Sequence, residues 1–170
     1  YTKNPNPNWF KVIKMVFTNR VIVLIGVIEF TSGVLRDGVM KWYRLYAKET
    51  GMGVENIMAN WGLWAAVTGI VGAFLAGWAS DKFFQSRRAP VAGIAQSVML
   101  LAAGAMLFAI NSHPLMLGIG ALLIMMAVIA VHSIMSGTAT ADFGGKKAAA
   151  TATGVADGFS KLGSSFQEFV

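Results

Sequence analysis

The 170-residue sequence contains no cysteine, only four prolines and few charged residues. The absence of cysteine excludes disulfide frameworks, cysteine-ligated zinc sites and thiol nucleophiles. Charged residues make up 13% of the chain, whereas a soluble domain typically has about a quarter. Hydrophobic residues make up 55% of the chain and come in long blocks. The composition therefore predicts an all-α fold of the membrane class, a polytopic helix bundle.

Motifs of most enzyme and nucleotide sites are also absent from the sequence. There is no glycine-rich dinucleotide loop, nucleophile elbow, metal-ligand cluster or pair of catalytic carboxylates. The "GGKK" at 144–147 lacks the other glycine of a P-loop and the Ser or Thr that follows its lysine. We therefore expect no enzyme activity, no cofactor and no bound metal.

Basic residues outnumber acidic residues by 14 to 8, which gives a formal net charge of +6. They lie in short clusters between apolar blocks, which suits topology determinants better than a surface that follows nucleic-acid phosphates. We therefore expect no nucleic-acid partner. The alternation of basic loops predicts that the N-terminus and the loops at 81–89 and 143–147 are cytoplasmic. The basic residues at 41–48 are an exception, on the outer side.

Five apolar blocks predict transmembrane helices at about 17–47, 56–80, 90–110, 115–141 and 148–170. The first four reach the roughly 20 residues that a helix needs to cross a bilayer. Residues 1–19 are expected to form a cytoplasmic linker with an interfacial anchor, and residues 20–170 a partial transmembrane bundle. The polar start without methionine and the end inside an apolar block predict a fragment of a longer chain. Gly72 and Ala76 have the small-xxx-small spacing that allows close helix packing.

The first block carries charges that a membrane helix seldom holds. Glu29 and Arg36 are seven residues apart and share one helix face, while Asp37 and Lys41 are one turn apart and can pair directly. Arg36 has two interpretations: a structural partner of Glu29 or Asp37, or an anion-binding residue in a central cavity. A planar guanidinium suits the second role, because it can bind two oxygens of a phosphate at once. Arg44 then belongs to the helix end that emerges into water.

The segment "GWASDKFFQSRRAP" at 77–90 resembles the cytoplasmic loop motif of the major facilitator superfamily. Such a motif acts as a charged latch, because an aspartate at a helix end can pair with basic groups of a neighbouring helix in one state and release them in another. Helix capping and positive-inside anchoring are the alternative explanation. The expected latch residues are Gly77, Asp81, Lys82, Arg87 and Arg88.

Three further polar residues lie in the fourth and fifth blocks. His132 lies in the middle of a predicted membrane helix, where it would relay protons, bind substrate or simply form a hydrogen bond within the bundle. Asp157 and Lys161 are one helical turn apart, so they either form an ion pair with each other or line the cavity.

Three segments in this order, "LRDGVMKW", "GWASDKFFQSRRAP" and "KKAAATATGVADGFSKLGSSF", are together similar to the organophosphate:phosphate antiporter family within that superfamily. The similarity covers nearly the whole chain and implies helices seven to eleven of a twelve-helix fold. It implies a secondary transporter of a bacterial inner membrane that exchanges glycerol 3-phosphate or a sugar phosphate for inorganic phosphate by alternating access. The implied partners are these small molecules, the lipid bilayer and the N-terminal half of the same transporter.

The resemblance also implies a role for Arg36. In this family the seventh helix carries an arginine in an R-x-G-x-x-x-W context, one of two phosphate-binding arginines, and Arg36, Gly38 and Trp42 match that context. The other arginine belongs to the first helix of the N-terminal half. The expected substrate-binding residues are Arg36, Trp42, His132, Asp157 and Lys161.

Two departures from the family pattern leave the exact substrate open. Lys41 stands where relatives often carry Asp or a neutral polar residue, and Asp157 and Lys161 replace small or aromatic residues. Three other functions also remain open on sequence grounds: a sugar-phosphate receptor without significant transport, a transporter of carboxylates or other organic anions, and a structural membrane subunit.

Overall fold

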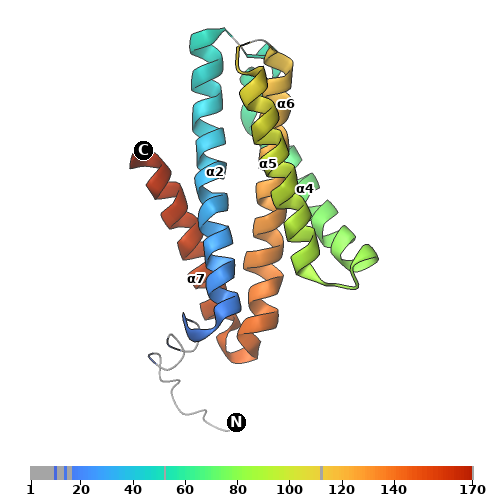
Figure 1. The fold of residues 1–170 in the computed structure, drawn as a ribbon, viewed down its shortest axis with the longest axis vertical. Coiled ribbons are helices and arrows are strands. Elements are labelled where there is room, and N and C mark those ends of the chain that lie inside the picture. Colours follow the sequence, from blue (N-terminus) through green and yellow to red (C-terminus); the bar gives the residue numbers. More distant parts are fainter. Residues whose placement is uncertain (1–9, 11–13, 15–16, 52, 112, 170) are drawn as a thin grey trace.

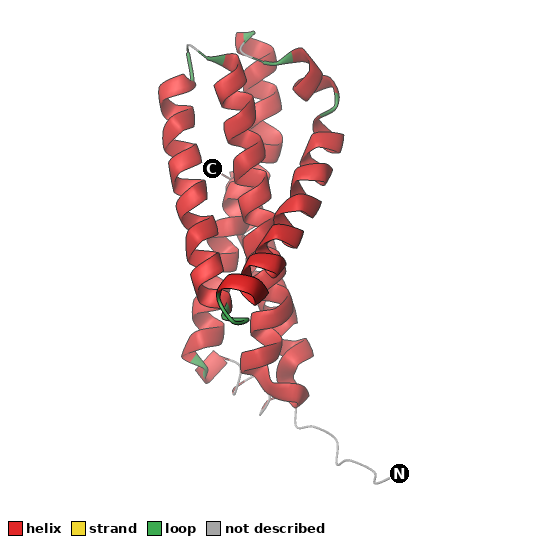
Figure 2. Cartoon of the chain, turned by 90° about the vertical axis from the view of Figure 1, so that its right-hand side faces the viewer, coloured by secondary structure: helices red, strands yellow, loops and turns green. Residues whose placement is uncertain are grey.

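The computed structural model describes residues 10, 14, 17–51, 53–111 and 113–169, and of residues 138–148 it describes only the backbone. Within these residues every regular element is helical, which confirms the predicted all-α bundle (Figures 1 and 2). The helices are α2 (Arg20–Thr50), α3 (Glu55–Ala59), α4 (Trp61–Phe83), α5 (Arg88–Ala109), α6 (Pro114–His132), the π-helical segment η1 (Ser133–Ala139) and α7 (Thr140–Phe169).

Local sequence signals explain where several helices begin and end. The side chain of Asn19 accepts a hydrogen bond of 3.0 Å from the backbone N–H of Val21 and so caps α2. Gly51 ends the same helix with a left-handed φ of 69°, which glycine adopts without steric cost. Pro114 opens α6, where its missing N–H is not needed.

Helix α6 is the central element of the bundle. It packs against α2, α4 and α5, while α7 packs along α2. Figure 1 shows α6 and η1 descending through the bundle and α7 rising beside α2. The core around α6 is made of buried aliphatic side chains, among them Ile124, Val128 and Val131, together with Met99 and Met135.

Glycines let neighbouring helices approach to backbone contact. A Cβ atom added to Gly33 of α2 would lie 2.1 Å from the carbonyl oxygen of Ser160, and one added to Gly163 of α7 would lie 2.0 Å from that of Phe30. A Cβ atom on Gly72 of α4 would lie 2.3 Å from the carbonyl oxygen of Met126. The close packing predicted from the small residues of the second block is therefore present between α4 and α6.

Three of the described helical segments are long and apolar enough to cross a membrane: Trp61–Phe83, Arg88–Ala109 and Pro114–Gly137. The sequence predicted four blocks of sufficient length, and the remaining one, the first block, corresponds to α2, which is long enough but carries more charge than these three segments. Helix α2 is 31 residues long, but its charged residues, including the buried Glu29, keep it outside the composition of an ordinary membrane span. Large apolar side chains such as Phe74 and Phe108 cover the outside of the bundle, as expected of a surface that faces lipid.

Helix bounds differ from the expected ones mainly at the ends of α2 and α7. Helix α2 extends to Thr50, three residues past the predicted end, because charged residues such as Lys48 are easily accommodated where a helix enters water. The loop expected at 143–147 is helical backbone from Thr140 onward, in a segment rich in alanine, the strongest helix former. Most of the linker predicted at 1–19 lies outside the described residues.

Candidate functional site

Arg36 lies between α2 and α7 and is held from both helices. Its Nε lies 3.2 Å from Oδ1 of Asp37, and its Nη2 donates a 3.2 Å hydrogen bond to Oγ of Ser164 on α7. Ser164 in turn donates to the carbonyl oxygen of Ser160 at 3.2 Å. Because a guanidinium has five N–H donors, these two contacts leave three donors for a ligand, and the side chain is 19% exposed.

Glu29 is the most deeply buried charged residue among those described, with an exposed fraction of 0%. Its Oε2 lies 2.7 Å from Nδ1 of His132 on α6, and its Oε1 has no hydrogen-bond partner among the described residues. Of the two partners considered for Arg36, the structure therefore pairs it with Asp37, while Glu29 pairs with His132. The interpretation of His132 as a residue bonded within the bundle matches this contact.

Asp157 approaches the same group from α7. Its Oδ1 lies 3.9 Å from Nε2 of His132 and accepts a hydrogen bond from Oγ of Ser136 in η1. The ion pair considered between Asp157 and Lys161 is not formed, because Asp157 is turned toward α6 and η1. Lys161 is exposed on α7. The structure thus gathers His132 and Asp157 but leaves Lys161 one turn away.

Lys41 and Trp42 lie further along α2, away from this group. Lys41 pairs with Glu168 of α7 rather than with Asp37, which corrects the predicted local pair. Lys41 pairs with Glu168 because Asp37 already contacts Arg36. Trp42 is 55% exposed and lines a pocket of about 280 Å³ with Lys41 and Glu168. Trp42 comes six positions after Arg36, so it points about 120° away around the helix.

Four of the predicted latch residues flank the turn between α4 and α5, whereas Gly77 lies inside α4. Asp81 accepts hydrogen bonds from Arg88 at 3.1 Å and from Ser86 at 2.9 Å. Its basic partner, Arg88, is thus the first residue of α5. Lys82 lies 4.9 Å from the centre of the Trp78 ring, a cation–π distance. The turn itself uses left-handed φ angles at two residues, 51° at Gln85 and 62° at Ser86. An added Cβ on Gly77 would have no described atom within 4 Å.

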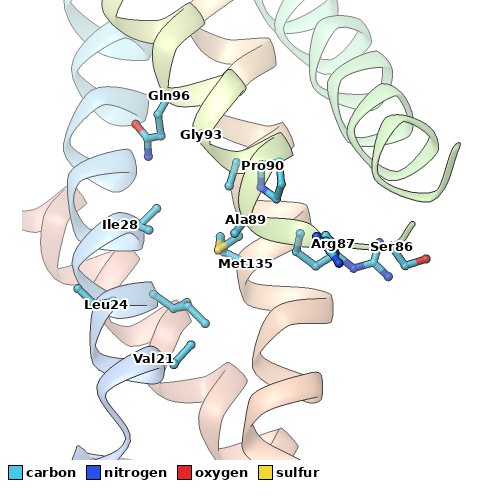
Figure 3. A pocket seen from close by; sticks show the side chains of 13 residues that line it. Val21, Leu24, Ile28, Ser86, Arg87, Ala89, Pro90, Gly93, Gln96 and Met135 are labelled. Atoms are coloured by element: carbon cyan, nitrogen blue, oxygen red, sulfur yellow. The ribbon is translucent and has the colours of Figure 1, made fainter. Parts of the chain in front are cut away.

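A separate apolar pocket of about 690 Å³ lies between α2, the start of α5 and Met135 (Figure 3). Its wall on α2 includes Leu24 and Ile28, and Arg87 lies at its α5 end. None of the expected substrate-binding residues lines it. The pocket is therefore distinct from the polar group around Arg36 and His132.

Two serines complete the polar group: Ser136, which the sequence places near His132 but to which we assigned no role, and Ser164, which sequence reasoning missed. Serine is common in membrane helices, because its small side chain allows close helix packing and forms a hydrogen bond to the backbone of its own helix. The presence of a serine therefore does not by itself indicate a functional site. Ser164 follows Ser160 by one turn on the face toward α2, and that spacing was the one available indication. For Glu29, the signal was a charge in an apolar run, but its partner lies 103 residues away.

Charged and polar side chains from α2, α6 and α7 thus meet on one side of an apolar helix bundle. Ionisable groups are costly within a membrane and are retained in substrate pathways, proton relays and ligand sites. These features are those of an integral membrane protein with a polar site inside its helix bundle.

Comparison with known proteins identifies relatives of this class. No family model and no solved structure matches the chain. It is 32% identical over 157 residues to the membrane sensor protein UhpC of Escherichia coli K12 and 30% identical over 157 residues to the glycerol-3-phosphate transporter of Bacillus subtilis. It is 29% identical over 153 residues to a probable hexose phosphate transport protein of Chlamydia pneumoniae.

These alignments cover 89% to 91% of this chain. The chain spans about a third of the length of the curated relatives it matches, 34% for the first of them. The relatives are bacterial, and none of these three is named as an enzyme. The matches confirm the resemblance to the organophosphate:phosphate antiporter family and identify an integral protein of a bacterial membrane.

Proposed function

We propose that the protein containing this chain binds a phosphate ester and moves it across a bacterial inner membrane in exchange for inorganic phosphate. The observation that carries the proposal is the guanidinium of Arg36, which is largely buried, held by Asp37 and Ser164, and has donors to spare. Two relatives named as transporters of glycerol 3-phosphate and hexose phosphate support the choice of substrate.

Arg36 would bind two phosphate oxygens through its remaining N–H groups. A charge-assisted pair of this kind is stronger and more directional than a neutral hydrogen bond. Asp37 and Ser164 fix the plane of the guanidinium before the ligand arrives, which reduces the entropy lost on binding. The second phosphate-binding arginine would come from the N-terminal half, which also closes the other side of the cavity.

Transport would follow from rocking of the two halves about a site near the bilayer midplane. An arginine that enters a low-dielectric interior without enough counter-charge is costly. The empty carrier therefore reorients poorly, whereas the carrier with a bound phosphate reorients readily. Obligatory exchange, rather than one-way flux, is the expected consequence.

The remaining predicted substrate-binding residues would contact the organic part of the substrate. Lys161 is exposed one turn from Asp157, so its ammonium can approach a second negative charge on the ligand. Asp157 and His132 offer acceptor and donor atoms to sugar hydroxyls at the open side of the bundle. Trp42 lies apart from this group and would contact the substrate only nearer the end of α2.

A charge-conserving substitution tests the anion site. Arg36→Lys in the full-length protein keeps the positive charge but removes the planar fork, so we expect uptake of labelled phosphate ester in exchange for phosphate to fall at least about a hundredfold, since the loss of a bidentate charged contact is worth several kcal/mol. Arg44→Lys, on the exposed side of the same helix, is the matched control and should leave exchange intact. Normal exchange by Arg36→Lys would overturn the proposal.

A second candidate is a sensor that binds a sugar phosphate without useful flux, and the observation that favours it is the 32% identity to a membrane sensor protein. Proteoliposomes separate the two functions. Binding of hexose phosphate with no counterflow of phosphate identifies a sensor, whereas counterflow identifies a transporter. Competition by inorganic phosphate distinguishes both from a carboxylate carrier.

A further inference from the structure

The carboxyl group of Glu29 is in an electrostatically incomplete environment. It is fully buried, its Oε2 contacts Nδ1 of His132 at 2.7 Å, and its Oε1 has no partner in the described part of the chain. A carboxylate with one neutral partner and one unpartnered oxygen is costly in an apolar interior. The cost falls sharply if the Glu29–His132 pair holds one additional proton and becomes neutral overall.

A path for such a proton leads from this pair to the open side of the bundle. Nε2 of His132 lies 3.9 Å from Oδ1 of Asp157, which also accepts a hydrogen bond from Ser136. Asp157 is 49% exposed, whereas Glu29 is not exposed at all. The three titratable groups come from α2, α6 and α7 and form a graded series from surface to interior. Chains of Asp, Glu and His in membrane bundles are the usual route for protons.

We propose that Glu29, His132 and Asp157 form a proton-binding site, and that this site is coupled to the anion site at Arg36. The proposal rests on the proposed function for the anion and deepens it by adding a coupling ion. A proton arriving at Asp157 bonds to Nε2 of His132, whose Nδ1–H already faces Glu29. The imidazole becomes an imidazolium beside the carboxylate, and the pair changes from one negative charge to none.

The site fits a proton rather than a metal ion. Within the described residues, no group of three or more His, Cys, Asp or Glu side chains has the arrangement that holds a metal. The described charged groups that interact electrostatically with His132 are Glu29 and Arg36 on α2 and Asp157 on α7. Those of α4 and α5 lie at the turn around Asp81 and Arg88, and α6 itself contributes His132 alone.

Coupling follows from the separation along α2. Glu29 and Arg36 are seven residues apart, which is about 10 Å along a helix. Each negative charge that a phosphate adds at Arg36 therefore raises the affinity of the Glu29–His132 pair for a proton by roughly tenfold at an effective dielectric constant of about 20. By linkage, a bound proton raises the affinity for the anion by the same factor. Anion and proton would then move together.

Proton uptake on ligand binding tests the proposal. Full-length protein in detergent and weak buffer is mixed with glycerol 3-phosphate at neutral pH; a pH-indicator dye reports protons, and calorimetry on the same sample reports binding. We expect the wild-type protein to take up as much as one proton per bound anion. His132→Gln and Glu29→Gln keep a hydrogen-bonding pair of similar size but should lose this uptake. His113→Gln, which changes the histidine that precedes α6, should retain it.

The outcomes separate this proposal from the proposed function. Binding without proton uptake in the wild-type protein, or uptake unchanged in His132→Gln, overturns the proton site and leaves the anion site standing. An absence of binding for both glycerol 3-phosphate and glucose 6-phosphate overturns the proposed function and, with it, the coupling. If neither pair variant folds, as judged by size-exclusion profile, the wild-type measurement alone decides.

Discussion

At the scale of single residues, two glycines determine how closely α2 and α7 approach. Gly33 and Gly163 each face a backbone carbonyl of the other helix, and a Cβ atom at either position would lie about 2 Å from that oxygen. Backbone cannot rotate away as a long side chain can, so the helices would have to separate. This contact also holds Arg36 near Ser164, so the geometry of the anion site depends on it.

Gly163→Ala is therefore expected to destabilise the protein by about 1–3 kcal/mol, the usual cost of overpacking, and to weaken phosphate binding. Gly154→Ala on the same helix is the control, because an added Cβ there has no described atom within 4 Å. It should be neutral or stabilising by up to about 1 kcal/mol. Thermal unfolding followed by intrinsic fluorescence measures both variants, and equal melting temperatures would contradict the close contact.

The pair between Lys41 and Glu168 gives a second prediction at the residue scale, one of small effect. Both side chains are about half exposed, so solvent screens their attraction. Lys41→Gln should leave the stability nearly unchanged and leave phosphate exchange close to the wild-type rate. A large loss of exchange would mean that Lys41 faces the substrate instead.

At the scale of elements, the turn between α4 and α5 is tied together by one acidic side chain. Asp81 joins Ser86 and Arg88, and the turn passes through two left-handed residues. If the turn is a latch, breaking the Asp81–Arg88 pair should change the rate at which the transporter switches between its inward-open and outward-open states. The affinity for the phosphate ester should change less. Because Asp81 is 65% exposed, the pair itself contributes little to folding.

Asp81→Asn should accordingly reduce phosphate exchange several-fold while the dissociation constant for the ester stays within about twofold. The stability should fall by no more than about 1 kcal/mol. Glu55→Gln, at the start of α3, changes an exposed acid at another helix end and serves as the control. Exchange at the wild-type rate by Asp81→Asn would show that the motif only anchors the helices.

At the scale of the whole molecule, the basic turn between α4 and α5 predicts the orientation in the membrane. Figure 1 shows this turn and the end of α2 at opposite ends of α4. The positive-inside rule assigns the turn, with Lys82, Arg87 and Arg88, to the cytoplasm. This chain contains no cysteine. A single introduced cysteine is therefore the one position in it that a thiol reagent can label.

We expect Glu49→Cys to react with a membrane-impermeant maleimide in intact cells, and Gln85→Cys to react only after the cells are permeabilised. Both residues are exposed, so access is limited by the membrane alone. Background cysteines elsewhere in the full-length protein are replaced first. The reverse labelling pattern would show that the chain has the opposite orientation in the membrane, with the turn between α4 and α5 outside the cytoplasm.

The sequence predicted the apolar helices well and the polar contacts poorly, and the two outcomes have different physical reasons. The span at 90–110 matches α5 (Arg88–Ala109) closely because a membrane helix must be long and continuous. Spacing along one helix shows which residues share a face, but not what they meet. Glu29 and Lys41 both found partners more than 100 residues away, His132 and Glu168, instead of neighbours on α2.

The π-helical segment η1 joins the helix that carries His132 to the helix that carries Asp157. A π-helix closes its hydrogen bonds one residue later than an α-helix does, so each π turn stores one extra residue. Release of that residue would turn everything beyond it by about 100° around the helix axis. A one-residue change of register in η1 would therefore turn Asp157 away from His132 and separate the buried Glu29 from the exposed end of this group.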